Sequence, residues 1–236
     1  MELEDFGLIE NATMNAESVE LSKQTKLNGI YNSTLIDCDI VLDPKGMPSS
    51  RLGSRFNIAR NVLERCTIHA KGRVHKFNVA ESVVFRHCKF VGGPFTEPVF
   101  GSGILSDSNY AEIIEMCDFT ECDLRDARFY TTNIQQLKLP DWPHIAIVAR
   151  DGDQVYATPS EINPAFSRLR DEVRAFGWSD SKLAKIIEFA VYAVGDGRDS
   201  PNIVVQHAED IVRLGGGTLQ LLKAELDRFA HPALRY

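Results

Sequence analysis

The spacing of apolar residues changes along the chain, and its most regular stretch lies near the middle. Between residues 117 and 139 a large apolar residue stands at every fifth position: Phe119, Leu124, Phe129, Ile134 and Leu139. Neither the 3.6-residue period of a helix nor the two-residue period of a strand keeps every fifth residue on one face. A four-sided coil does, if each five-residue unit forms one side. The pattern therefore predicts one coil over residues 117–136, with its large residues pointing inward.

The same spacing recurs upstream, where cysteine marks it. Each of the five cysteines precedes a large apolar residue by two positions, as Cys38 precedes Ile40. Stepping back by fives gives three further runs, which are Ile30, Leu35 and Ile40; Ile58, Leu63 and Ile68; and Ala80, Phe85 and Phe90. Cysteine-to-cysteine intervals of 28, 22 and 29 residues are longer than four sides of five. We place the extra residues after the cysteine side, as loops within 41–55, 69–76 and 91–109, which would line one edge of the coils.

The cysteines are predicted to be reduced and buried. Four of them should form a column with neighbouring backbones about 4.8 Å apart, and these are Cys38, Cys66, Cys88 and Cys117. An odd number of cysteines argues against a closed disulfide framework. No CxxC or Cys-His pair has the spacing of a metal site. Small buried side chains are the simplest interpretation.

Beyond Leu139 the five-residue spacing stops. The segment HIAIVARDGDQVYA indicates two strands joined at Asp151-Gly152. From residue 163 the period is helical, which predicts helices over 163–177 and 180–194, a third from Pro201 to Gly215 and a fourth beginning at Thr218. A stack of coils exposes apolar surface at its end, so we expect these helices to act as a cap. A second binding domain or a dimerisation module is the alternative.

The repeating order of a small residue, a polar residue and then Leu or Phe in 117–139 resembles the pentapeptide-repeat family. The resemblance implies that family's right-handed parallel β-helix with four sides per coil. We therefore expect a mainly β fold with added α structure. A short quadrilateral β-helix with an N-terminal cap would span 1–140, a β-hairpin or linker 141–160, and a small α-helical capping or binding module 161–236.

Charge is distributed in blocks of opposite sign. Residues 1–43 hold nine acidic residues and two lysines, 44–89 ten basic and two acidic residues, and 90–126 eight acidic residues and one arginine. Such blocks indicate recognition by charge. The net charge of −7 disfavours direct binding to nucleic acid. The opening MELEDFGLIE lacks the features of a signal peptide and no apolar run is long enough to span a bilayer, so we expect a cytoplasmic protein without a membrane partner.

Sequence motifs of catalysis are missing. No GxSxG, HExxH or Cys-His-Asn pattern occurs. The stretch LGGGTLQ lacks the lysine of a phosphate-binding loop, and GDGRDS lacks the ligand spacing of a calcium loop. We therefore predict a protein that is not an enzyme, with no catalytic residue, no cofactor and no metal site.

The resemblance also implies a way of acting. Pentapeptide-repeat proteins that protect DNA gyrase are thought to resemble duplex DNA in shape and charge. The outward acidic residues predicted to meet a basic partner are Glu112, Glu115, Asp118, Glu121, Asp123 and Asp126. In the longest loop, Phe95 and Phe100 are either hydrophobic anchors for that partner or pack against the fourth side of the coil.

These features favour a non-enzymatic inhibitor of the immunity or antitoxin kind, which occludes a basic enzyme such as a nuclease. One alternative is a structural β-helix adaptor or oligomerisation scaffold, since blocks of opposite charge can pair one copy with another as a homodimer or larger assembly. Another is a β-helix that binds or cleaves carbohydrate. The sequence leaves the identity of the partner and the interface open.

Overall fold

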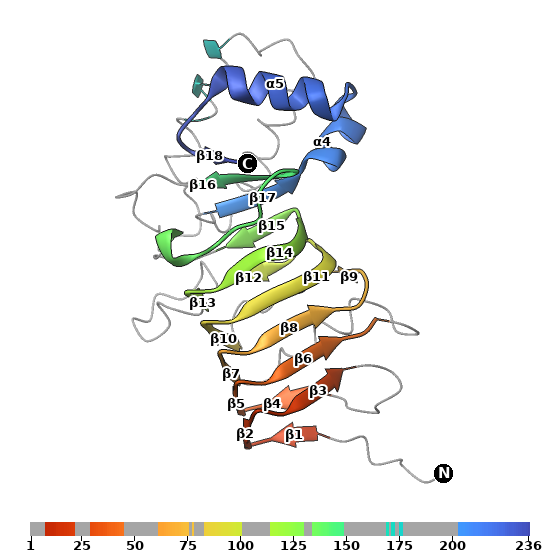
Figure 1. Ribbon diagram of the computed structural model, residues 1–236, viewed down its shortest axis with the longest axis vertical. Coiled ribbons are helices and arrows are strands. Elements are labelled where there is room, and N and C mark those ends of the chain that lie inside the picture. Colours follow the sequence, from red (N-terminus) through yellow and green to blue (C-terminus); the bar gives the residue numbers. More distant parts are fainter. Residues whose placement is uncertain are drawn as a thin grey trace.

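The protein is mostly β, with parallel sheets and two C-terminal helices among the residues that the structure describes. It is a computed structural model, and it describes residues 8–21, 29–44, 61–75, 77, 83–100, 114–129, 134–148, 169, 171–172, 175–176 and 203–236. Strands lie above one another along the longest axis, from β1 at one end to the helices at the other (Figure 1). We call the strands from β1 to β15 the stack.

Within the described residues, three sheets of the stack consist of parallel strands alone. The first sheet pairs β1 (Leu8–Glu10) with β4 (Gly29–Tyr31). The second has the order β13 (Ile114–Glu115), β10 (Val83–Arg86), β7 (Asn61–Glu64), β5 (Thr34–Ile36) and β2 (Thr13–Asn15). The third has the order β14 (Asp118–Arg125), β11 (Lys89–Thr96), β8 (Thr67–Ala70), β6 (Asp39–Leu42) and β3 (Ser18–Leu21), with β9 (Val74–His75) also beside β11. Apart from β8 and β9, strands of the stack that follow one another in the chain lie in different sheets, and each return of the chain adds a strand to a sheet.

The residues predicted to point inward form the core. Leu63 pairs in register with Leu35 on one side and Phe85 on the other. The predicted core residues that are buried are Ile30, Leu35, Ile40, Leu63, Ile68, Phe85, Phe90, Phe119, Leu124 and Phe129. Ile58, Ala80 and the side chain of Ile134 lie outside the described residues. For the rest, the five-residue period is confirmed.

The cysteine column is also confirmed. The backbone N–H of Thr67 donates to the carbonyl oxygen of Cys38, and that of Lys89 donates to Cys66. The Cys88 thiol donates to the carbonyl oxygen of Leu63 at 3.3 Å. All five cysteines are free and buried. The hydrogen bond with the Cys117 thiol, together with burial, raises the pKa of Cys88 to about 12, so that thiol stays protonated at neutral pH.

A second column stands at the corner between the second and third sheets. It consists of non-glycine residues with φ between 49° and 54°, which are Ala16, Asp37, Arg65, His87 and Met116. We call it the corner column. Backbone hydrogen bonds connect its levels, because the N–H of Asp37 donates to Glu64 and that of Arg65 donates to Arg86. The left-handed conformation turns the chain into the next sheet, and it costs a side-chain-bearing residue about 1–2 kcal/mol.

The loop predicted for 91–109 is wrong over residues 91–100. These residues complete β11 and form β12 (Val99–Phe100). The five-residue spacing continues from Phe90 to Phe95 and Phe100, and all three side chains are buried. Gly92, with φ 83°, makes the bend possible, since a Cβ there would lie 2.5 Å from the carbonyl oxygen of Ala70. The remaining residues of the predicted loop, 101–109, lie outside the described residues.

The described residues from β16 to the end of the chain, which we call the C-terminal segment, continue the stack with antiparallel strands. β15 (Ala127–Phe129) pairs in parallel with β12 and antiparallel with β17 (Ile203–His207). β17 pairs antiparallel with β16 (His144–Val148), and β16 with β18 (Leu234–Arg235). A short 3-10 helix, η2 (Ile134–Gln136), lies between β15 and β16. The second strand of the predicted hairpin, with Asp151-Gly152, lies outside the described residues, and β16 instead finds its partners near the end of the chain.

The helix predicted to begin at Pro201 is wrong at its start. Residues 203–207 form β17, and the helix α4 spans Ala208–Gly215. Three β-branched residues in a row, Ile203, Val204 and Val205, favour a strand buried on both faces. The fourth predicted helix is confirmed as α5 (Leu219–Phe229), with the Thr218 hydroxyl accepting from the N–H of Leu221. Most of the residues of the two earlier predicted helices lie outside the described ones.

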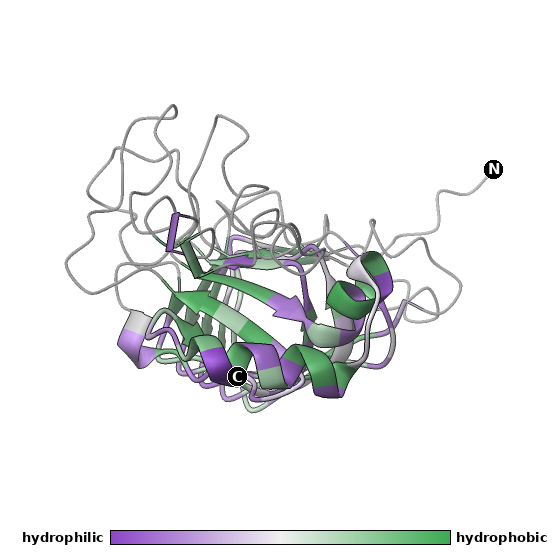
Figure 2. Cartoon of the chain, turned by 90° about the horizontal axis from the view of Figure 1, so that it is seen from above, coloured by the Kyte–Doolittle hydropathy of each residue, from purple (hydrophilic) through white to green (hydrophobic). Residues whose placement is uncertain are grey.

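The β16–β17 pair lies between two hydrophobic cores. Ala146, Val148 and Val205 pack into the core of the stack. Ile145, Ile147 and Val204 face the other way, into a second core with residues of α4 and α5. In the view down the stack, polar and apolar residues alternate along α5, as expected of a helix with one buried face (Figure 2). The C-terminal segment therefore covers the end of the stack. Neither helix in the described part of the chain is long and apolar enough to cross a membrane.

Candidate functional site

The predicted acidic surface is neutralised within the chain. Glu112 lies outside the described residues, and each of the other five carboxylates has a basic partner. The pairs are Glu115 with Arg86 at 3.5 Å, Asp118 with Lys138 at 3.3 Å, Glu121 with Lys89, Asp123 with Arg125 at 3.2 Å and Asp126 with Arg128 at 3.5 Å. These residues are therefore not a bare acidic patch.

The same residues do not share one face of the molecule. Glu115 belongs to the second sheet, Asp118 and Glu121 to the third, and Asp126 follows β14 at the turn into β15. Burial alone would raise the pKa of Asp118, but hydrogen bonds from Thr120 and Lys138 outweigh it and lower that pKa. Burial raises the pKa of Asp126. The five carboxylates thus have different surroundings.

The blocks of charge in the sequence are neighbours in the stack. Asp37 of the first acidic block contacts Arg65 of the basic block at 2.7 Å, and Glu20 contacts Lys71 at 3.4 Å. Lys89 of the basic block contacts Glu121 of the second acidic block. A hydrogen bond from Arg65 lowers the pKa of Asp37. A basic turn of the chain between two acidic ones thus gives these charges partners inside the molecule.

Phe95 and Phe100 are not exposed anchors for a partner. Both are fully buried, and their ring centroids lie 5.6 Å and 6.1 Å from that of Phe77. Phe100 also stacks on Phe129 at 4.9 Å. Of the two alternatives given by the sequence, exposed anchors are excluded, and both rings pack within the core of the stack. The physical reason is that the five-residue period runs through both residues.

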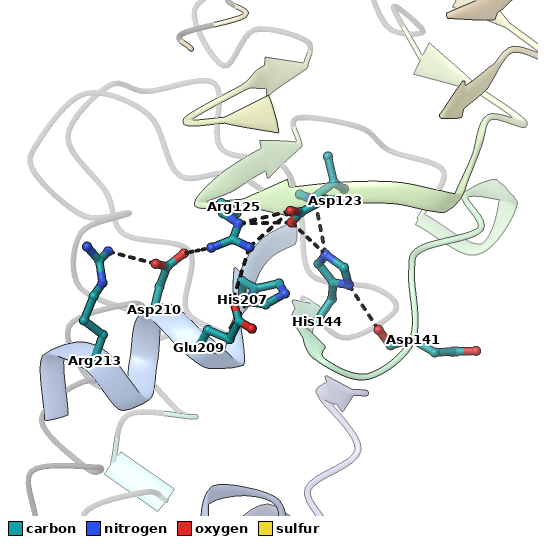
Figure 3. A network of polar contacts seen from close by, with 9 residues as sticks. Asp123, Arg125, Asp141, His144, His207, Glu209, Asp210 and Arg213 are labelled. Carbon is teal, nitrogen blue, oxygen red and sulfur yellow. Dashed lines mark hydrogen bonds and ion pairs between the residues drawn. The ribbon is translucent and has the colours of Figure 1, made fainter. Parts of the chain in front are cut away.

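A different group of polar residues gathers where the stack meets the C-terminal segment (Figure 3). It comprises Asp123, Arg125, His144, His207, Glu209 and Asp210, and we call it the junction cluster. β14 contributes the first two residues, β16 and β17 the histidines, and α4 the last two. β14 is the last strand of the third sheet, so its outer backbone groups need other partners.

His144 supplies one of those partners. Its Nε2 accepts a hydrogen bond from the backbone N–H of Leu124 at 3.1 Å, and its Nδ1 lies 3.2 Å from the carbonyl oxygen of Asp141. The first contact requires a lone pair on Nε2, and the second requires a proton on Nδ1. His144 is therefore the neutral Nδ1–H tautomer in this arrangement, with its ring almost entirely buried.

His207 caps the helix that follows it. Its Nδ1 accepts from the backbone N–H of Glu209 at 3.3 Å, as an N-cap side chain does. Its ring stands edge-on to that of His144, with centroids 4.9 Å apart. Burial lowers the pKa of His207, and the neighbouring Arg125 lowers it further. Both effects favour the neutral imidazole.

Asp123 is the carboxylate of the junction cluster that lies beside both histidines. Burial alone would raise the pKa of Asp123, but the hydrogen bonds and the positive charge of Arg125 outweigh burial and lower that pKa. The Arg125 guanidinium also contacts Glu209 at 3.3 Å and Asp210 at 3.5 Å. Arg125 thereby connects β14 to α4, and the stack to the segment that covers it.

The arrangement combines one carboxylate with two neutral imidazoles. Their donor atoms all lie within 4.8 Å of one another, which is a set that could hold a metal ion. Sequence reasoning predicted no metal site, because Asp123, His144 and His207 are far apart in the chain and form no motif. The only signal was the placement of both histidines in short apolar segments after the five-residue spacing stops. No protein-family model, curated protein or solved structure matches the chain.

Proposed function

We propose that the sheets of the stack are the sides of a short right-handed parallel β-helix of the pentapeptide-repeat kind, and that this protein is a non-enzymatic inhibitor of a basic partner enzyme. The five-residue period and the return of the chain to each sheet support the β-helix. The proposed action is occlusion, in the manner of an immunity or antitoxin protein. It needs a rigid surface and no reacting group.

The observation that carries the proposal is one continuous surface. The third sheet aligns two rows of outward residues across five strands. The rows are Ser18, Asp39, Thr67, Lys89 and Asp118, and Glu20, Val41, His69, Val91 and Glu121. None of the ten is buried. We call them the outer face.

The outer face has the properties of a binding surface. Its backbone is fixed by ladder hydrogen bonds, and many of its side chains are short, so little conformational entropy is lost on binding. Two of its carboxylates stand well into solvent, with exposed fractions of 66% for Asp39 and 59% for Glu121. The net charge of −7 would steer a basic protein towards the molecule.

A pair of substitutions that removes two negative charges and keeps the size of both side chains tests this proposal. The full chain and its Asp39→Asn/Glu121→Gln variant are used to capture partners from the native host at low and high salt, followed by mass spectrometry. We expect a basic enzyme that is retained at low salt, is released at high salt, and loses activity when the wild-type protein binds it. The variant should bind and inhibit that enzyme several-fold more weakly.

The matched control is Asp227→Asn, an exposed carboxylate on α5 at the far end of the molecule. It should capture and inhibit as the wild type does. Equal inhibition by the Asp39→Asn/Glu121→Gln variant would remove the outer face from the proposal. Recovery of the protein alone, in a salt-sensitive assembly, would replace the inhibitor with a scaffold.

A further inference from the structure

We propose that Asp123, His144 and His207 bind a divalent transition-metal ion of the zinc class at the junction between the stack and the C-terminal segment. Three separate strands, β14, β16 and β17, bring one donor atom each within 4.8 Å of the others. Two imidazole nitrogens and a carboxylate oxygen are a ligand set that zinc accepts. This inference does not depend on the proposed inhibitor function.

Asp123 and His144 are spaced as two ligands of one tetrahedral ion, and the His207 donor atom lies within 4.8 Å of both. Zinc bonds to nitrogen and oxygen of about 2.0–2.2 Å place two tetrahedral ligand atoms about 3.4 Å apart. Oδ1 of Asp123 lies 3.4 Å from Nε2 of His144. The imidazoles of His144 and His207 have centroids 4.9 Å apart and an interplanar angle of 84°. Two rings that share a tetrahedral ion are separated by about 5 Å for the same bond lengths.

No hydrogen lies between the Asp123 carboxylate and Nε2 of His144. Because Nε2 of His144 accepts the Leu124 N–H, it has no proton to donate to the carboxylate oxygen 3.4 Å away. Two electron-rich atoms therefore face one another in a largely buried place. A metal ion between them would give both atoms a positive partner and would take the place of the Leu124 N–H at Nε2.

His144 is held as metal-binding histidines usually are. Nδ1 of His144 lies 3.2 Å from the Asp141 carbonyl oxygen, so its proton is donated away from the cluster. For His207, whose Nδ1 accepts the Glu209 N–H at 3.3 Å, binding through Nε2 would require the ring proton to shift to Nδ1, where the Glu209 carboxylate lies 3.6 Å away. Such contacts to carbonyl or carboxylate oxygens fix the orientation of a ligating imidazole.

Charge and access also suit a cation. Asp123, Glu209 and Asp210 bring three carboxylates together, against the guanidiniums of Arg125 and Arg213. The side chain of Asp123 is 31% exposed, which gives an ion a path from solvent. Nitrogen ligands favour zinc and its neighbours over magnesium and calcium, which prefer oxygen alone. Bound there, the ion would tie the C-terminal segment to β14, with water in the fourth position.

The test uses the full chain, freed of metal by a chelator. Zinc is titrated by calorimetry and cobalt(II) by visible absorption. We expect one ion per chain, a tetrahedral cobalt spectrum and a melting temperature that rises with zinc concentration. No saturable uptake, an octahedral cobalt spectrum or an unchanged melting temperature would each overturn the proposal.

His207→Asn is the informative variant, because asparagine is also a good N-cap and keeps α4 started while removing the imidazole. It should weaken zinc binding at least about 10-fold and abolish the zinc-dependent rise in melting temperature. His69→Asn, on the exposed outer face, is the control and should bind zinc as the wild type does. Undiminished binding by His207→Asn, or equal loss in both variants, would contradict the site. If His207→Asn folds poorly, zinc affinity is measured on Asp123→Asn, which should also bind zinc more weakly. The cobalt spectrum of the wild-type protein then tests the tetrahedral geometry.

Discussion

At the scale of single residues, the corner column stores backbone strain. Met116 has a φ of 49° and a side chain that is about half exposed. Replacing it with glycine removes the steric cost of the left-handed conformation and little packing. We expect Met116→Gly to raise the free energy of unfolding by about 0.5–1 kcal/mol, measured by chemical denaturation. Val41→Gly, in the middle of β6, is the control and should lower it; a loss in both variants would contradict the argument.

Asp126 makes stability depend on pH in the opposite sense from a paired surface carboxylate. Burial raises the pKa of Asp126 in the folded state above its value in the unfolded chain. The free energy of unfolding therefore decreases as the pH rises from the unfolded-state pKa to the folded-state pKa. In the structure the Gln206 amide donates to Oδ1 of Asp126 at 2.9 Å. Asp126→Asn removes the charge, and the asparagine oxygen can still accept this hydrogen bond. The variant should melt higher than wild type at pH 7, with the gain shrinking towards pH 3. A lower melting temperature at pH 7 would show that the Arg128 ion pair outweighs burial.

At the scale of elements, the ion pairs across neighbouring strands should help to set their order. Lys89→Glu places like charges opposite each other on β11 and β14, and we expect it to cost about 0.5–1 kcal/mol of unfolding free energy. Glu121→Lys alone should also destabilise. The double exchange should restore most of the loss, and a denaturation cycle at low salt measures this. Additive losses would mean that the two side chains do not interact.

Elements with a local cause could be predicted from the sequence. The five-residue period located inward residues such as Leu63 and Phe119, since a covalent spacing sets which side chains share a core. The helix α5 followed from its Thr218 cap and apolar stripe. The strand β17 could not be predicted in this way, because it runs directly into the helix α4. Its partners in β15 and β16 are also 55 to 78 residues away in the chain.

The junction cluster could not be predicted for the same reason. The environment of Asp123 depends on His144 and His207, which arrive from two later strands of a different sheet. From the sequence, Asp123 was one of six outward acids. Its burial, its low pKa and its imidazole neighbours are products of how the chain closes on itself. The charge blocks were also visible, but not the fact that neighbouring turns pair them.

At the scale of the whole molecule, β17 is the element that joins the two cores. Val205→Pro removes a backbone donor from a strand with partners on both sides, and we expect a loss of about 3 kcal/mol or more. The lost pairing should also expose apolar surface, seen as increased binding of a hydrophobic dye. Val205→Ala separates this effect from simple loss of packing, and it should bind no more dye than wild type. Equal dye binding by both variants would show that the strand is not the connection.

The direction of β17 has a consequence for growth. A stack of parallel strands exposes unpaired backbone N–H and C=O groups at each end. A further chain of the same direction can pair with them, as happens in fibrils. Because β17 runs antiparallel to β15, the repeating polarity of β12 and β15 is broken where another copy would add. β17 thus covers the end of the stack and also prevents a second copy from extending it with further parallel strands.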